Sequence, residues 1–321
     1  MTSHGALDTD LPLSKWIVIL DELQRNKLIS LTITGGEPLF RPDFPEFIRE
    51  VYKRPFRYSI NTNGTLVKPT IIETLKRYSS RLDTLMVSLD GPDAETVDNQ
   101  RGEGVFKEMV NGVKQLRDAA LPYGFYCTVT ALNVEKLNET AEFALSLGAD
   151  WIKFNSFLLA GPDLSNSMIP ELSSVNEAAE KLSMLADKHG GRITGSILEM
   201  RGRALNYTRG TLNKTSGCAY SCGGGRNKIA VFPDGRVTPC DHLPLVTLGD
   251  ITRQSLEEIL TGKEMGRYSQ FLAQPRSDYP LCENCEYIEY CSGGCPVEPL
   301  SSNEKIGLDR HSCLKLAIEE K

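Results

Sequence analysis

The stretch that decides the fold runs over residues 31–40 and reads LTITGGEPLF. Its β-branched and aliphatic beginning predicts a short buried strand, and the two glycines and the proline that follow predict a tight turn. Glu37 stands inside this turn. Because loops at the carboxyl ends of parallel strands form the ligand sites of α/β domains, a carboxylate in this position indicates a site for an ammonium group.

Short β-rich runs that predict strands alternate with helical patterns between residue 13 and about residue 190. This alternation is typical of βα units. A helix is expected over residues 14–26, before the first strand, and one helix after every strand. The second helix begins near Asp43, which is at capping-box spacing from Glu46. The fold class is therefore α/β, with a parallel sheet that lacks its opening strand, and periodicity leaves open whether the sheet closes into a barrel. Further strands are predicted over residues 57–60, 84–89, 125–130 and 151–154.

Composition excludes several classes of protein. The chain has 321 residues, with 36 Lys and Arg against 42 Asp and Glu, and a formal charge of −6. Its apolar runs are far shorter than the ~20 residues of a membrane span, and its start lacks the features of a secretory signal. A mildly acidic chain without a basic block also disfavours nucleic acid. We therefore expect a cytoplasmic protein with no membrane and no nucleic acid as partner.

Two more polar loops follow predicted strands in the same position as the first loop. Residues 61–64 read NTNG, and residues 88–92 read SLDGP. Each is ordinary turn chemistry by itself. Three such loops on one rim of a parallel sheet favour a pocket for a small polar ligand.

The character of the chain changes after about residue 213, where eight of its nine cysteines lie in turn-rich sequence. We expect a small second domain over residues 213–321, joined by a connector over 191–212 to a first domain over 1–190. A hairpin over residues 228–238 leads into Cys240. The cysteine spacings are Cys218-x3-Cys222-x17-Cys240 and Cys282-x2-Cys285-x5-Cys291-x3-Cys295-x17-Cys313.

Three interpretations of these cysteines compete. Disulfides are disfavoured because nothing indicates an oxidising compartment and the short spacings suit a shared metal. Zinc stays open, since eight thiolates make two four-cysteine sites. The tight run of four cysteines followed by a distant fifth is more typical of iron–sulfur clusters, which we favour. The ninth cysteine, Cys127, stands in a β-rich run and is expected to be a buried apolar residue.

The motif TGGEPL at residues 34–39 resembles the GGEP motif of radical S-adenosylmethionine (radical SAM) enzymes. The cysteine array resembles the SPASM domain that follows many of their barrels. The resemblance covers about residues 13–160 and 213–315, and in pattern it is closest to the anaerobic sulfatase-maturing enzymes. It implies a partial (β/α)6 TIM-like barrel without its first strand, followed by a small cysteine-rich SPASM domain.

The resemblance also implies a binding site for SAM. In the family the GGEP motif contacts the methionyl amino group, while Ser88 and Arg101 resemble positions that bind the ribose hydroxyls and the methionyl carboxylate. The residues implied at this site are Gly35, Gly36, Glu37, Pro38, Asn61, Ser88 and Arg101.

Two auxiliary [4Fe–4S] clusters are implied in the SPASM region. Asp241, directly after Cys240, resembles the catalytic base of the sulfatase maturases. The ligands implied are Cys218, Cys222, Cys240 and Cys295 for the first cluster, and Cys282, Cys285, Cys291 and Cys313 for the second.

One departure from the family is plain in the sequence. Radical SAM enzymes carry a C-x3-C-x2-C motif whose thiolates hold a third [4Fe–4S] cluster beside SAM, but no cysteine precedes Cys127 in this chain. We expect truncation or a misplaced start codon, with natural loss of the motif as the alternative. The third cluster is expected only in a full-length form.

The leading hypothesis for function is radical chemistry on a peptide or protein substrate, as in the maturases, with electrons from a reductant such as flavodoxin or ferredoxin. Two alternatives stay open at this point. One is a non-catalytic iron–sulfur protein that relays electrons or binds a peptide, and the other is a zinc-binding interaction module.

Overall fold

The computed structural model divides the chain into two compact units. The first comprises Met1–Thr128, Lys136–Phe154 and Leu185–Thr194, and the second comprises Val129–Glu135, Asn155–Met184 and Gly195–Lys321. The domain boundaries expected from the sequence remain a prediction. The structure describes residues 10–158, 166–215, 222–279, 282–291, 293–297, 300 and 313–319.

A six-stranded sheet forms the centre of the first unit, with its strands side by side in sequence order. Strands β1 to β4 pair in parallel, and so do β5 and β6, which confirms the predicted parallel sheet. All five predicted strands are present. The sequence patterns miss β6, because a strand of two residues shows no periodicity. The strands are β1 (Ser30–Ile33), β2 (Arg57–Thr62), β3 (Leu82–Ser88), β4 (Tyr123–Val129), β5 (Ile152–Ser156) and β6 (Ile193–Thr194).

Helices precede β1 and connect the strands. The expected helix over residues 14–26 is α1. The expected capping box at Asp43 does not form, because this side chain makes no cap hydrogen bond and instead accepts one from Arg41 at 3.0 Å. The helices are α1 (Leu13–Arg25), α2 (Phe44–Tyr52), α3 (Pro69–Arg77), α4 (Ala94–Arg101), α5 (Val105–Asp118), α6 (Leu137–Ser146), α7 (Leu172–Lys188) and α8 (Ser196–Thr208).

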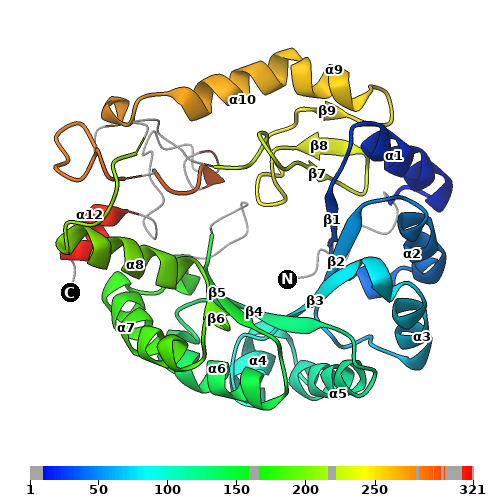
Figure 1. Ribbon diagram of the computed structural model, residues 1–321, viewed down its shortest axis with the longest axis horizontal. Helices are drawn as coiled ribbons and strands as arrows, with labels where there is room; N and C mark the ends of the chain where they lie inside the picture. Colours follow the sequence, from blue (N-terminus) through cyan, green and yellow to red (C-terminus); the bar gives the residue numbers. More distant parts are fainter. Residues whose placement is uncertain are drawn as a thin grey trace. The chain divides into compact units, whose positions relative to one another are not determined.

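The two faces of the sheet differ in polarity, as β2 illustrates. Tyr58, Ile60 and Thr62 are buried, whereas the intervening Ser59 and Asn61 are partly exposed. The buried face looks toward the helices, since the Tyr58 hydroxyl donates to the backbone oxygen that follows α3, at 3.0 Å. Figure 1 shows α2, α3 and α5 along the outer side of the strands. The polar side chains therefore point to the inner face of the sheet.

The second unit has little regular structure. A three-stranded sheet contains β7 (Ala230–Val231), β8 (Arg236–Thr238) and β9 (Gly249–Asp250), and β7 and β8 form the predicted antiparallel hairpin. The α-helices that follow within the described ranges are α9 (Leu256–Thr261), α10 (Lys263–Ala273) and α12 (Leu314–Glu319). No helix within the described ranges is both long enough and apolar enough to cross a membrane.

A small hydrophobic cluster packs against two of the cysteines in the second unit. Its buried members are Ala204, Tyr287 and Leu314, and Cys285 and Cys291 pack against them. So few buried residues contribute limited hydrophobic free energy. Metal bound by the neighbouring cysteines would add stabilisation to this cluster.

Candidate functional site

Glu37 lies at the carboxyl end of β1 and ties that loop to the end of β2. One carboxylate oxygen accepts hydrogen bonds from the Thr62 hydroxyl at 2.7 Å and from the Leu39 backbone N–H at 3.1 Å. The other accepts from the Asn63 backbone N–H at 2.7 Å. Burial raises the pKa of Glu37 above its ordinary value, although these hydrogen bonds oppose the shift. A carboxylate offers about four acceptor positions, so one remains for a ligand.

The backbone beside this carboxylate is open. A Cβ atom placed on Gly35 or Gly36 would meet no atom within 4 Å, and both residues are exposed. Gly35 also has φ of +147°, a conformation that residues with side chains rarely adopt. Pro38 follows and starts the short 3-10 turn that Glu37 caps. The loop therefore presents a carboxylate next to uncovered peptide groups.

Asn61 carries a polar atom without a partner. Its amide nitrogen lies 3.4 Å from the Thr34 hydroxyl, but its Oδ1 atom is buried and has no hydrogen-bond partner in the described part of the chain. An unpaired buried acceptor costs about 1–3 kcal/mol. A ligand that donates a hydrogen bond at this position would remove that cost.

Ser88 shares the face of the sheet on which Asn61 lies. Asn61 is in register with Met86 of the neighbouring parallel strand, and Ser88 follows two residues later at the end of β3. Since side chains alternate along a strand, Asn61, Met86 and Ser88 point to the same side. The structure thus brings two residues predicted at the SAM site to one face, at the same end of the sheet.

Arg101 ends α4 and forms an ion pair that the sequence analysis did not anticipate. Its Nε atom donates to the Asp90 carboxylate at 2.7 Å, and Asp90 is only 4% exposed. The other Asp90 oxygen accepts from the Thr128 backbone N–H at 3.0 Å. The Arg101 side chain is still 25% exposed. Arg101 therefore holds the loop after β3 in place while part of its guanidinium faces solvent.

Three of the four cysteines predicted for the first cluster share one electrostatic environment. Burial lowers the pKa of Lys228, but the charges of Cys240, Asp241, Cys222 and Cys295 more than offset this effect, so that the pKa is raised overall. Backbone N–H groups point at two of the sulfurs, from Gly224 to Cys222 at 3.3 Å and from His242 to Cys240 at 3.4 Å. Cys218 lies outside the described residues.

The four cysteines predicted for the second cluster also influence one another. The pKa of Cys282 is raised to about 12 by burial first and then by the charges of Cys291, Cys285 and Cys313. Like charges that crowd together disfavour the thiolate form, whereas a bound cation inverts this effect and deprotonates its thiol ligands. The donor set and its crowding therefore fit a metal cluster.

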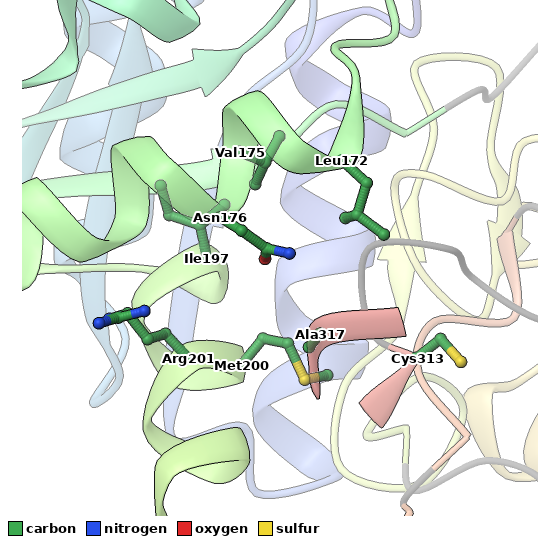
Figure 2. Close-up of a pocket in the computed structure, with 8 residues that line it drawn as sticks. All are labelled: Leu172, Val175, Asn176, Ile197, Met200, Arg201, Cys313 and Ala317. Carbon is green, nitrogen blue, oxygen red and sulfur yellow. The ribbon is translucent and has the colours of Figure 1, made fainter. Parts of the chain in front are cut away.

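Cys313 also borders a small hollow next to α7, α8 and α12. Figure 2 shows the Cys313 sulfur pointing away from the apolar side chains of Met200 and Ala317 that line this hollow. Its remaining lining residues are Leu172, Val175, Asn176, Ile197 and Arg201.

The described cysteines can be compared with the requirements of a site for a single metal ion. Among the described residues, no group of three His, Cys, Asp or Glu side chains converges closely enough to hold one metal ion. None of the described cysteines is in a disulfide. A cluster of four irons is larger than one ion, and its cysteine ligands surround it from several sides.

Asp241 lies at the surface beside the first cysteine set. The Cys240 thiol lies 3.3 Å from its Oδ1 atom, and the carboxylate side chain is 47% exposed. Cys240 itself is buried, which raises the pKa of its thiol to about 11. The structure thus puts an accessible carboxylate next to a buried thiol, and the role of Asp241 as a base stays a prediction.

Cys127 has the place expected of a structural residue. It lies within β4 with 1% of its surface exposed, and burial raises the pKa of its thiol well above the ordinary value. A thiol in this state is a poor nucleophile and a poor metal ligand. The prediction of a buried apolar residue is confirmed.

Comparison with known proteins decides the family. Residues 7–144 match the radical SAM superfamily, and residues 222–286 match SPASM, an iron–sulfur cluster-binding domain. The chain is 32% identical over 277 residues to the AdoMet-dependent heme synthase of Methanosarcina barkeri, which covers 82% of this chain and 76% of that protein. This chain belongs to the radical SAM superfamily. Its two domains imply SAM and iron–sulfur clusters as cofactors.

Relatives of this radical SAM/SPASM protein include peptide-modifying enzymes. The antilisterial bacteriocin subtilosin biosynthesis protein AlbA of Bacillus subtilis is 27% identical over 288 residues, which cover 88% of this chain and 60% of AlbA. A solved structure of native anSMEcpe with bound AdoMet and a peptide has a TM-score of 0.73 at 16% identity, and it covers 96% of this chain and 87% of that one. This similarity shows the partial TIM-barrel-like fold with its SPASM domain.

Some residues near these sites escape prediction from the sequence. Tyr268, whose buried hydroxyl has no partner among the described residues, lies far along the chain from Cys240 in a helix with no distinguishing motif. Arg276, 2% exposed, lowers the otherwise raised pKa of Cys282 through its charge. Neither residue follows a local pattern, so only the tertiary structure reveals its position.

Proposed function

We propose that this chain is a maturase-like radical SAM/SPASM protein that, in its intact form, acts on a peptide or protein substrate. Its membership of the family and its similarity to AlbA support the choice of substrate. The observation that carries the proposal is the set of buried and half-buried thiols in the SPASM region, which fits two clusters. When bound, SAM and the third cluster, held by a C-x3-C-x2-C motif, would supply a 5′-deoxyadenosyl radical that abstracts hydrogen from the substrate.

SAM would bind at the carboxyl ends of β1 to β3. The remaining acceptor position of Glu37 suits the methionyl ammonium group, and the open backbone at Gly35 and Gly36 leaves room for it. Asn61 Oδ1 would accept a hydrogen bond from the ligand. Ser88 and the exposed part of Arg101 would bind the ribose hydroxyls and the carboxylate.

Two [4Fe–4S] clusters would occupy the SPASM region. The backbone N–H groups of Gly224, His242 and Gly293, which lie 3.3–3.4 Å from cysteine sulfurs, would stabilise the negative charge of the bound thiolates. The ligands would be Cys218, Cys222, Cys240 and Cys295 for the first cluster, and Cys282, Cys285, Cys291 and Cys313 for the second.

Asp241 would act as the base that removes a proton from the substrate. Its exposed carboxylate can meet a large substrate, and its position next to Cys240 puts the proton transfer close to the first cluster, which would accept the product electron. The electrons for SAM cleavage would come from flavodoxin or ferredoxin.

Anaerobic reconstitution with iron and sulfide tests this function. We expect about eight irons and eight sulfides per chain, broad absorption near 400 nm and retention of the iron on gel filtration. Cys127→Ala serves as the matched control, because it removes a buried thiol outside the SPASM region and should keep all of the iron. Stoichiometric zinc without labile sulfide would instead support the zinc-binding interaction module.

A second candidate substrate is a heme precursor. The 32% identity to an AdoMet-dependent heme synthase over most of the chain favours it. Titration of the reconstituted protein with a porphyrin and with a peptide library separates the two substrates. We expect saturable binding of peptide, and saturable binding of the porphyrin alone would favour the second candidate. Failure to bind SAM or either substrate would favour an electron relay without catalysis.

A further inference from the structure

The Tyr268 phenol is a buried polar group for which the proposed mechanism has no use. Tyr268 lies in α10 with 3% of its surface exposed. Its hydroxyl oxygen is buried and has no hydrogen-bond partner among the residues that the structure describes. A buried tyrosine hydroxyl usually finds a partner, and leaving one unpaired costs about 1–3 kcal/mol. The position therefore indicates a partner other than the described protein groups.

The hydroxyl faces the first cysteine set. A Cβ atom placed on Gly224 would lie 3.3 Å from the Tyr268 hydroxyl oxygen and 3.4 Å from Cys222 Sγ. Both polar atoms thus border one small space, and glycine at position 224 keeps that space open. Gly225, with φ of +70°, packs directly against the Tyr268 ring, because its Cβ would come within 2.9 Å of the ring edge.

The electrostatics agree with this geometry. Burial raises the pKa of Tyr268, and the charges of Cys222, Cys240 and Cys295 raise it further. These three cysteines are the described members of the first set, so the phenol lies within reach of all their charges. Its O–H group therefore keeps its proton and is available as a donor.

We propose that the Tyr268 hydroxyl donates a hydrogen bond to a sulfur of the iron–sulfur cluster held by Cys222, Cys240 and Cys295, and so raises the reduction potential of that cluster. This inference rests on the proposed function, because it requires the cluster. Reduction adds negative charge to the cluster sulfurs, and a hydrogen bond to a charged acceptor is stronger than one to a neutral acceptor. The bond therefore stabilises the reduced form more than the oxidised form.

The test is a redox titration of the reconstituted 321-residue chain, followed by electron paramagnetic resonance, with Tyr268→Phe. We expect the equilibrium constant for reduction of the first cluster to fall about tenfold, which is about 59 mV for a one-electron couple. The second cluster should keep its potential. Cys240→Ser, which replaces one thiolate of the first cluster, identifies the signal of that cluster.

Tyr287→Phe is the matched control. Tyr287 is also buried, but it packs in the cluster with Ala204 and Leu314 beside the second cysteine set. The substitution removes a tyrosine hydroxyl that is hydrogen-bonded to Glu319, and it should leave the potential of the first cluster unchanged. An equal shift in both variants would mean that loss of any buried hydroxyl disturbs the domain, and would overturn the inference.

A second measurement keeps the inference testable where Tyr268→Phe folds poorly. Incorporation of 3-fluorotyrosine at position 268 preserves the shape of the side chain and makes its hydroxyl a stronger donor. The potential of the first cluster should then rise. If the variants bind iron but their first cluster keeps the reduction potential of the wild type, the inference is overturned. A buried water would then be the partner of the hydroxyl. Protein that binds no iron would overturn the proposed function instead.

Discussion

The two cysteine sets offer the same kind of ligand in different surroundings. The first set lies beside exposed charged groups, Lys228 and Asp241, and beside the Tyr268 hydroxyl. The second set packs against an apolar cluster and has the buried Arg276 near Cys282. Exposed charged groups next to a cluster suit chemistry with a substrate. An apolar environment suits a cluster with a structural or electron-relay role. The ligand type alone therefore does not fix the role of a cluster.

The largest expected effect is the absence of SAM cleavage, because both cysteine sets would hold clusters without an open iron. Each proposed set has four cysteines, enough to fill a four-iron cluster, so neither would leave an iron open for SAM. We expect the 321-residue polypeptide to make no 5′-deoxyadenosine with SAM and dithionite. A form that carries a C-x3-C-x2-C motif ahead of residue 1 should bind about four more irons and make it. Chromatography of the nucleosides measures both results.

Robust formation of 5′-deoxyadenosine by the 321-residue polypeptide would contradict the assumption that both cysteine sets fill their clusters. One of the two sets would then have to hold a cluster with an open iron. Heat-treated protein and a reaction without dithionite are the controls, because both exclude slow chemical decay of SAM as the source.

The next effect separates the sets by their contribution to folding. Cys291 packs against the Ala204, Tyr287 and Leu314 cluster, so Cys291→Ala should release about four irons and also unfold the SPASM region. Cys240→Ala should release iron from the first set while most of the protection against proteolysis remains. Limited proteolysis with mass spectrometry reads out the difference. Equal proteolytic sensitivity in the two variants would show that both clusters are structural to the same degree.

Asp241 tests whether the first set is the one that meets the substrate. In a form of the enzyme that makes 5′-deoxyadenosine, Asp241→Asn should lower product formation by about 10²–10⁴-fold, the usual contribution of a general base, while 5′-deoxyadenosine continues to form. Asp234→Asn is the control, since that carboxylate lies in the hairpin turn and accepts a hydrogen bond from Arg236 at 2.6 Å. A normal rate of product formation by Asp241→Asn would show that Asp241 is not the base and is only a structural residue of its turn.

Part of the fold and of the candidate site could be predicted from the sequence. The five strands from β1 to β5 and the β7–β8 hairpin follow from periodicity and turn residues, and the Glu37 loop follows from its motif. Asp90 was visible only as part of a polar loop, because its pairing with Arg101 depends on how α4 packs. Tyr268 could not be found, since its importance comes from a contact across the fold with the space at Gly224.

The smallest expected effect concerns Lys228. The residue is exposed as a whole although its ammonium group is partly desolvated, and its charge lies near the first set. Lys228→Gln should therefore lower the equilibrium constant for reduction of the first cluster by about two- to fivefold, the range of a solvent-screened charge. The second cluster should not respond. Lys263→Gln, at the start of α10, is the control for loss of a surface charge. Redox titration at low and high salt measures the shift, which should shrink at high salt.

The central claim is that each cysteine set holds an iron–sulfur cluster of its own. The most direct measurement is anomalous X-ray scattering from crystals of the reconstituted protein, recorded on both sides of the iron edge and of the zinc edge. We expect two separate iron peaks, one among Cys222, Cys240 and Cys295 and the other among Cys282, Cys285, Cys291 and Cys313. Peaks that appear only above the zinc edge, or a single iron peak shared by the two sets, would contradict the account.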